Sequence, residues 1–272
     1  ANNNVAIGYQ AGHLMNTGTN NVIIGSDAGD ALTSGAHNTL VGNRAGGALN
    51  SGGYHVLIGS GAGASMTTNT LGSVAVGYNA LASQTIKGRT VAIGVQSLTA
   101  LDQTGQDDYN VAIGYRSGYV TTTGLYNIFM GAFAGQQHQG QDSVMIGHTA
   151  GQYATGSYNT FVGSDAGQGG TTSAPYSSGI NNTALGYQAL AGFTTGILNV
   201  AIGVNALDAV TTATRNVAVG SGAGGGTTSS GGVFIGNYAG SAANADNLVI
   251  IGRDAGASVT GTGNIAIGYT AL

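Results

Sequence analysis

Hydrophobic residues recur in a short phrase that ends in glycine and returns about every seventeen residues. Val111-Ala112-Ile113-Gly114 is one copy of this phrase. The copies end at Gly8, Gly25, Gly42, Gly59, Gly77, Gly94, Gly114, Gly131, Gly147, Gly163, Gly186, Gly203, Gly220, Gly236, Gly252 and Gly268. A fixed period over a whole chain indicates a repeat architecture. We number positions within each repeat from this glycine, which is position 0.

Positions −3 and −1 are β-branched or apolar in every repeat, as in Val5 and Ile7 or Ile128 and Met130. Residues spaced by two share one face of a strand, so we expect −3 and −1 to fill the interior of each coil. Position +3 is always Ala or Ser, which predicts a second wall packed close to the first. We therefore predict an all-β fold, a flattened parallel β-roll of sixteen coils of about 17 residues, each with room for two short strands and two turns.

The stacking should be parallel, because no Asn in the chain is followed by Gly, the strongest two-residue hairpin signal. Asparagine also occupies position −4 in ten repeats. These are Asn4, Asn21, Asn38, Asn110, Asn127, Asn159, Asn182, Asn199, Asn216 and Asn264. Stacked coils would let their amides form a hydrogen-bonded ladder; alternatively, Asn simply tolerates turn dihedrals. Both interpretations agree with stacked coils.

Position −2 points to the opposite side from −3 and −1, yet it is apolar in every repeat. A strand that is apolar on both faces is covered on both faces, and a second copy of the chain would be the simplest cover. We therefore predict that the bulky residues of this face, with the leucines at +4, form a trimer interface. These are Ile23, Leu40, Leu57, Phe129, Met145, Phe161, Phe234, Ile250, Leu81, Leu98, Leu190 and Leu207.

The side-chain sizes at positions −2 and +4 are also inversely related. Position +4 is Leu only where −2 is Ala, and all eight bulky −2 residues occur with Gly at +4, as in Phe161 with Gly167. Two positions that are never both large should fill one space, because close-packed interiors do not tolerate overpacking. The alternative is that two subtypes of repeat were copied as whole units.

The composition changes this picture little. Charged residues make up 6%, the net charge is −4, and Cys, Glu and Trp are absent. No basic footprint for nucleic acid, disulfide framework or thiolate metal site is therefore expected. No stretch is long and apolar enough for a membrane helix, and no signal peptide is visible. We expect one elongated domain, residues 1–272, that is a segment of a longer extracellular protein, since neither end resembles a solenoid cap.

Two longer connections are candidate surface contacts. The link from Gly94 to Gly114 carries Asp102, Asp107 and Asp108, which could bind calcium but match neither the EF-hand loop nor the glycine-aspartate nonapeptide repeat. We therefore expect a solvated acidic loop. The link from Gly163 to Gly186 holds extra residues within 168–180, including Pro175 and Tyr176. Insertions in solenoids leave as surface loops, and we expect both links to be the most exposed and least ordered parts.

Signals for catalysis are poor. The five histidines occupy unrelated repeat positions, and glycine-rich runs such as 59–63 are further copies of the repeat without the lysine or helix of a phosphate-binding loop. We expect no enzyme activity, no cofactor and no metal.

The runs Asn110-Val111-Ala112-Ile113-Gly114-Tyr115 and 182–190 resemble the head repeats of trimeric autotransporter adhesins (the YadA-like head) and related repeats of bacteriophage tail fibres. The resemblance covers essentially the whole chain. It implies a left-handed parallel β-roll that trimerises side by side and attaches to surfaces or host cells. The repeats are longer than the usual adhesin head repeat, which favours the phage-type fibre.

The leading functional hypothesis is thus a homotrimeric segment of a bacteriophage tail fibre for host attachment, whose partners are itself and a cell-surface glycan or protein receptor. The runner-up is an adhesin head at a bacterial surface. An extracellular matrix filament would form open polymers instead of closed trimers. An ice- or carbohydrate-binding solenoid is a further alternative. Ice binding would need a flat, regular array of threonines. The threonines form clusters such as 121–123 and 171–172, which we interpret as lacking a repeat phase, and this counts against ice binding.

Overall fold

The computed structural model describes residues 1–85, 88–102 and 107–272. Those residues form short strands and turns and contain no helix. The strands are β1 (Val5–Ile7), β2 (Val22–Ile24), β3 (Thr39–Val41), β4 (Ser51–Gly53), β5 (Val56–Ile58), β6 (Thr68–Leu71), β7 (Val74–Val76), β8 (Val91–Ile93), β9 (Val111–Ile113), β10 (Ile128–Met130), β11 (Val144–Ile146), β12 (Thr160–Val162), β13 (Thr183–Leu185), β14 (Val200–Ile202), β15 (Val217–Val219), β16 (Val233–Ile235), β17 (Val249–Ile251) and β18 (Ile265–Ile267).

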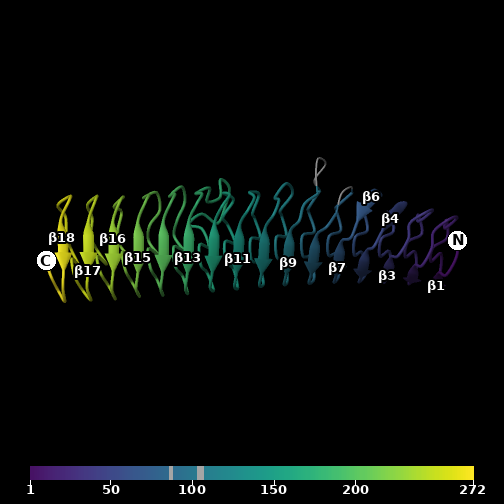
Figure 1. Ribbon diagram of the computed structural model, residues 1–272, viewed down its shortest axis with the longest axis horizontal. Coiled ribbons are helices and arrows are strands. Elements are labelled where there is room, and N and C mark those ends of the chain that lie inside the picture. The colour runs from purple at the N-terminus through teal and green to yellow at the C-terminus, as the bar shows by residue number, and fades with distance from the viewer. Residues whose placement is uncertain (86–87, 103–106) are drawn as a thin grey trace. The chain divides into compact units, whose positions relative to one another are not determined.

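The chain forms two compact units, Ala1–Gln139 and Gly140–Leu272. In each unit, consecutive coils place their strands side by side in one parallel sheet (Figure 1). The order is β1-β2-β3-β5-β7-β8-β9-β10 in the first unit and β11 to β18 in the second. The register matches each repeat position with its copy one coil away, so that Val200 pairs with Val217 and Ile202 with Val219. The prediction of a parallel β-solenoid is confirmed, with about fifteen turns.

The second wall of each coil differs from the prediction. Among the described residues, a second strand occurs only as β4 and β6, which pair in parallel, and as isolated bridges such as Thr19 with Ala36. Elsewhere this wall is built of turns, because positions +2 and +4 have positive φ angles, as at Asp27 (54°) and Leu190 (53°). These turns still stack, since Gly29 N–H donates to the Ala45 carbonyl of the next coil at 3.0 Å.

The glycine at position 0 is required by the backbone. Its φ angle lies between 129° and 140° in all sixteen copies, a region that L side chains rarely adopt. These glycines also stack on one another: a Cβ added to Gly25 would lie 2.5 Å from the carbonyl oxygen of Gly42 in the next coil. Position 0 therefore has no room for any side chain, which explains why it is always glycine.

The core of each coil lies on the side opposite to the predicted one. Position −2 faces inward: Ile23, Leu40 and Phe129 are 0% exposed. Positions −3 and −1 face outward, and Ile113 and Ile202, expected to be almost wholly buried, are partly exposed, Ile202 by 36%. The prediction that −3 and −1 fill the interior is wrong. Successive side chains of a strand point to opposite faces, so −4 and −2 lie on the same, inner face.

The predicted small second wall is confirmed. The residues at +3 are buried from Ala28 to Ala255, and they face the −2 side chains across a thin interior. The side chains at −2 and +4 share the space of this interior. A Cβ added to Gly167 would overlap the ring of Phe161, and one at Gly63 would lie 2.9 Å from Leu57 Cδ1. Position +4 is Gly in these coils because the −2 side chain fills its space.

Neighbouring coils fill the interior where both positions are small. Ala112 and Gly118 share one coil, and a Cβ at Gly118 would lie 2.7 Å from Leu98 and 2.8 Å from Phe129, which come from the coils on either side. Gly224 is enclosed in the same way by Leu207 and Phe234. The packing therefore compensates both within a coil and between adjacent coils.

The asparagines at −4 form the amide ladder inside the coils. Asn199 Nδ2 donates to Asn182 Oδ1 at 3.1 Å, and the Asn199 backbone N–H donates to the same oxygen at 3.0 Å. The Asn199 amide also donates to the carbonyl of Ala213 at 3.0 Å, which ties the strand to the opposite turn. Each buried Asn thus satisfies groups in its own coil and in its neighbour. Of the two interpretations, the ladder is confirmed.

Candidate assembly interface

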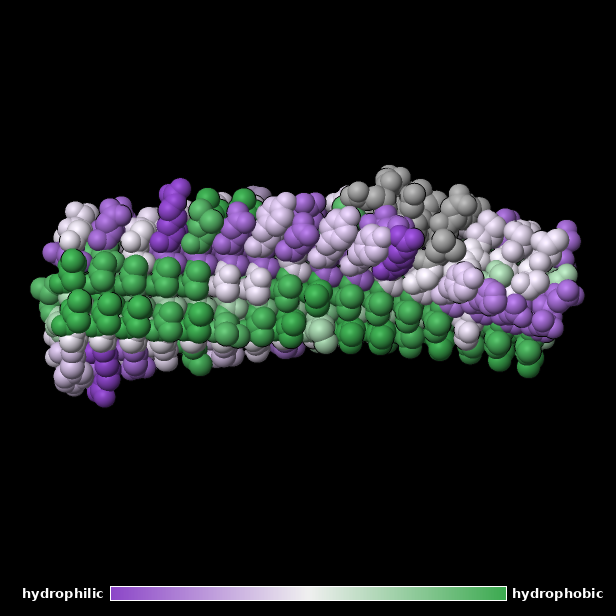
Figure 2. All heavy atoms as spheres, in the orientation of Figure 1, coloured by the Kyte–Doolittle hydropathy of each residue, from purple (hydrophilic) through white to green (hydrophobic). Residues whose placement is uncertain are grey.

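The outward side of the main sheet is apolar. We call the −3 and −1 residues of each unit the outward face. No residue of this face is buried, and its most exposed members include Ile7 (59%), Leu185 (48%) and Ile267 (66%). Figure 2 shows the result as two adjacent rows of hydrophobic side chains across the coils. Continuous apolar surface of this kind on a water-soluble protein marks an interaction site.

Tyrosines flank the outward face. Position +1, beside the −1 row, carries exposed Tyr9, Tyr78 and Tyr187. Position −5, beside the −3 row, carries further rings that stack between coils, as Tyr109 does on Tyr126 with ring centroids 5.7 Å apart. Tyrosine is enriched in protein interfaces because it combines a large apolar ring with a hydroxyl group. The apolar rows are therefore bordered by residues that suit the rim of an interface.

The twelve residues predicted to form a trimer interface are all buried within a single chain. Their exposure is 0%, or 1% for Ile250. They are Ile23, Leu40, Leu57, Phe129, Met145, Phe161, Phe234, Ile250, Leu81, Leu98, Leu190 and Leu207. This prediction is wrong, because a side chain without accessible surface cannot contact another subunit. The phenylalanines among them lose their exposure on folding of one chain, not on assembly.

The three aspartates of the first long link do not converge. Asp102 accepts a hydrogen bond from Thr85 Oγ1 at 2.6 Å, and Asp107 forms an ion pair with Arg89 at 2.5 Å. Asp108, predicted as a surface contact, is buried beside Gln84 and Thr90. Residues 103–106 of this link lie outside the described residues. Within the described ranges, no three His, Cys, Asp or Glu side chains are grouped so as to hold a metal ion.

Burial raises the pKa of the Asp108 carboxyl to about 7. The carboxylates of Asp107 and Asp102 act in the same direction, whereas hydrogen bonds from Gln84 and Thr90 oppose the shift. Asp108 Oδ1 and Gln84 Oε1 are both buried without a partner in the described structure. A protonated Asp108 would supply the donor that these two oxygens lack.

The second long link is exposed, as predicted. Residues 172–175 lie at the surface, and the ring of Tyr176 stacks on that of Tyr153 with centroids 6.1 Å apart. The link rejoins the solenoid at Ser177, which is buried and bridges to Ala154.

Threonines do have a repeat phase, contrary to the reading of the sequence. Position +8 is Thr in ten repeats and otherwise Asn, Asp or Gln. The threonines are Thr33, Thr67, Thr85, Thr122, Thr155, Thr171, Thr194, Thr211, Thr228 and Thr260, of which Thr171 opens the 168–180 insertion. Thr67 Oγ1 donates to the Thr85 carbonyl at 2.8 Å, and Thr194 Oγ1 donates to that of Thr211 at 3.1 Å. This row therefore ties neighbouring turns together, and eight of these ten threonine hydroxyls bond to other protein groups.

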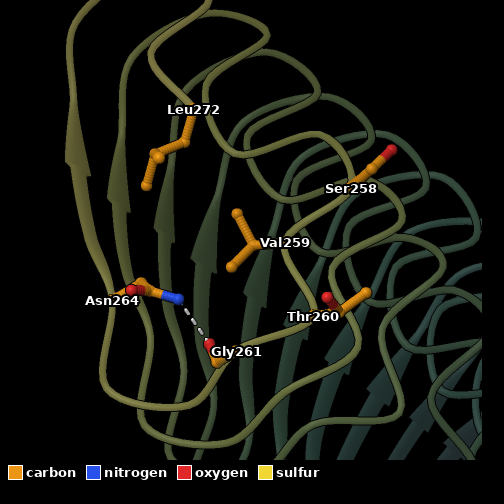
Figure 3. A pocket seen from close by; sticks show the side chains of 6 residues that line it. All are labelled: Ser258, Val259, Thr260, Gly261, Asn264 and Leu272. Carbon is orange, nitrogen blue, oxygen red and sulfur yellow. Dashed lines mark hydrogen bonds between the residues drawn. The ribbon is translucent and has the colours of Figure 1, made fainter.

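A hollow of about 340 Å³ lies on the last coil (Figure 3). Val259, Asn264 and Leu272 point into it, and they occupy positions +7, −4 and +4. In other coils these positions form the interior and are covered by the following coil. We interpret this hollow as the open cross-section of the core of the last coil, rather than as a ligand site.

The fold and the outward face define a parallel β-solenoid with one uncovered apolar side. The described part of the chain has no helix that is long and apolar enough to span a membrane. No family model, no curated protein and no solved structure matches the sequence.

The outward face was not predicted, although two features of the sequence indicate it. Asn at −4 lies on the same side of the strand as −2, and its amide needs the partners that a coil interior provides. The inverse sizes of −2 and +4 in the same repeat indicate that these two positions share one interior. Both observations place −2 inside and leave −3 and −1 outside.

Proposed function

We propose that this chain is a structural and adhesive fibre segment, a homotrimer of left-handed β-rolls that associate side by side through the outward face. Its place is a bacteriophage tail fibre, outside the cell, where it mediates attachment to the host. The chain itself performs no catalysis. The observation that carries this proposal is the outward face, two rows of side chains that are apolar except for three threonines at −3 and that are exposed or half-buried in every coil of each unit.

The physical argument concerns the cost of exposed apolar surface. Transfer of apolar area out of water contributes about 25 cal/mol per Å², and the rows repeat at each turn, so the gain on association grows with the number of coils. The β-branched residues of the rows lose little side-chain entropy when an interface orders them. The number of subunits and the adhesive role come from the resemblance of residues 110–115 and 182–190 to trimeric fibre repeats.

The test is the mass of the purified chain in solution, measured by light scattering. We expect three times the 26.6 kDa of one chain. The variant Leu185→Glu places a carboxylate on the outward face and should shift the mass toward one chain, because burial of an unpaired charge costs several kcal/mol. Thr212→Glu adds the same charge at an exposed turn and should leave the mass unchanged. A wild-type monomer at high concentration would contradict the proposal.

A further inference from the structure

A polar notch interrupts the surface of the first unit at Gly61. Position +2 normally carries a side chain that stands outward, such as Arg44 and Asn79 in the coils on either side. Gly61 has none, and Ala64 behind it is small, so a hollow of about 370 Å³ opens between the neighbouring coils. We call this hollow the Gly61 notch.

The groups around the notch are of four kinds. Arg44 and Asn79 border it at position +2, Tyr78 stands beside it with a ring that is 53% exposed, and Ser60 and Ser65 add hydroxyl groups. The Asn79 amide oxygen is the atom nearest to the point where a Cβ of Gly61 would lie, so this amide lies directly over Gly61. The notch therefore combines a cation, an amide, hydroxyls and an aromatic ring.

The Arg44 guanidinium is available to a ligand. The ion pairs found among the described residues use Arg89 and Arg253 instead. The aspartates of the preceding coil, Asp27 and Asp30, do not line the notch. In a chain with only six Lys and Arg residues, an unpaired guanidinium beside a hollow is the feature that most favours an anionic group.

We propose that the Gly61 notch binds a carboxylated sugar, one uronic-acid residue of a surface polysaccharide. A guanidinium binds a carboxylate through two parallel hydrogen bonds. The Tyr78 ring offers an apolar face for the C–H side of a pyranose, and the amide and hydroxyl groups serve its hydroxyls. The volume lies at the small end of ligand pockets, which suits a single sugar ring. This inference deepens the proposed attachment function and rests on it for its biological role.

Saturation-transfer NMR and calorimetry on the full chain test this inference, with glucuronic acid as the probe and glucose as its neutral counterpart. Loss of one charged hydrogen-bond partner weakens binding by about tenfold or more, so glucose should bind at least that much more weakly. Arg44→Gln should abolish the preference for glucuronic acid. Arg215→Gln removes the same charge from an exposed residue of the second unit and should change nothing.

Gly61→Asn fills the notch with the side chain that position +2 already carries in other coils. Asn79 and Asn205 adopt φ angles of 51° and 55° there, so the backbone of Gly61 at 70° accepts Asn. The new Cβ would overlap the Asn79 amide oxygen, so this amide has to rotate away in the variant. We expect at least about a tenfold loss of affinity. Gly222→Asn, the same change in the second unit, should have no effect. Circular dichroism would confirm that each variant is folded.

Unchanged binding in folded Gly61→Asn, or no binding of glucuronic acid at about 10 mM, would overturn the inference. The mass of the same samples separates it from the proposed function. Trimers that do not bind glucuronic acid would overturn the inference alone. Monomers that bind it in the notch would support the inference and contradict the trimeric fibre.

Discussion

The pair formed by positions −2 and +4 shows how single residues determine the interior of each coil. Gly167 leaves room for the Phe161 ring, and Leu190 fills the space that Ala184 leaves. Leu190 does so with a φ angle of 53°, which is unfavourable for Leu. Leu occupies this backbone only in coils where Ala at −2 leaves space for its side chain. The inverse relation is therefore a packing requirement and not merely a relic of copied repeats.

Ala184→Phe should overpack the space beside Leu190 and destabilise the chain by about 1–3 kcal/mol. Leu190→Gly should leave a cavity and cost about 2–4 kcal/mol, partly offset because Gly relieves the positive φ angle. The double variant recreates the pair of Phe161 and Gly167 and should be more stable than the sum of the two costs by at least about 1 kcal/mol. Denaturant unfolding at fixed protein concentration measures all three. Additive costs would show that the two positions do not share space.

Asp108 should make stability depend on pH. Its pKa is about 7 in the folded chain against an ordinary value of 3.8. The folded state therefore binds more protons than the unfolded chain between these pH values, and stability falls as pH rises through that window. Asp108→Asn keeps the size of the side chain and cannot ionise. Between pH 4 and pH 7, we expect the wild type to lose about 2–4 kcal/mol of stability relative to this variant. Thermal midpoints of both proteins measured across this pH range test the expectation. Parallel pH profiles would exclude a role of Asp108.

At the scale of the strand, the repeat length, the parallel stacking and the tight second wall could be predicted from the sequence. They follow from the period of the glycines and from the small residues at +3. The side of the strand that faces inward was predicted wrongly, because −3 is β-branched in every repeat and −1 in all but those with Met130 and Leu185. Such residues favour strands on either face, so Val200 and Ile202 indicate a strand without indicating its inner side. The inner side is instead defined by Asn199 and Ala201, which pack against the opposite turns.

The asparagine ladder should contribute measurably to stability. Asn199→Ala removes donors to Asn182 and Ala213 and an acceptor for the backbone N–H of Asn216. Buried groups that lose their partners should cost about 2–4 kcal/mol in total. The side chain of Asn264 in the last coil makes a single hydrogen bond within the described structure, to the Gly261 carbonyl, and this residue is partly exposed. Asn264→Ala should therefore cost less than about 1 kcal/mol. Equal costs in denaturant unfolding would contradict a ladder whose strength depends on burial.

At the scale of the molecule, each unit presents surfaces of different character. The outward face is apolar and flanked by tyrosines, whereas the row at +8 is polar and bonded to itself, and the Gly61 notch carries an unpaired cation. The low charge gives no long-range field to steer a partner. Recognition must then come from contact surfaces. The outward face suits self-association, and the notch suits a small polar ligand.

Neighbouring residues of β16 separate folding from assembly. Phe234 faces inward and is 0% exposed, whereas Ile235 faces outward and is 39% exposed. Phe234→Ala should cost about 3–5 kcal/mol per chain, because it leaves a cavity in the interior. Ile235→Ala should cost less than about 1 kcal/mol in an isolated chain, since much of the side chain already contacts water there.

Assembly should change the stability cost of Ile235→Ala but not that of Phe234→Ala. Association through the outward face would bury the rest of Ile235, so the cost of Ile235→Ala should rise with protein concentration as the associated state becomes populated. Thermal unfolding over a hundredfold range of concentration measures this, with Phe234→Ala as the control whose cost stays constant over that range. If the cost of Ile235→Ala is also independent of concentration, the outward face does not bind a second copy of the chain.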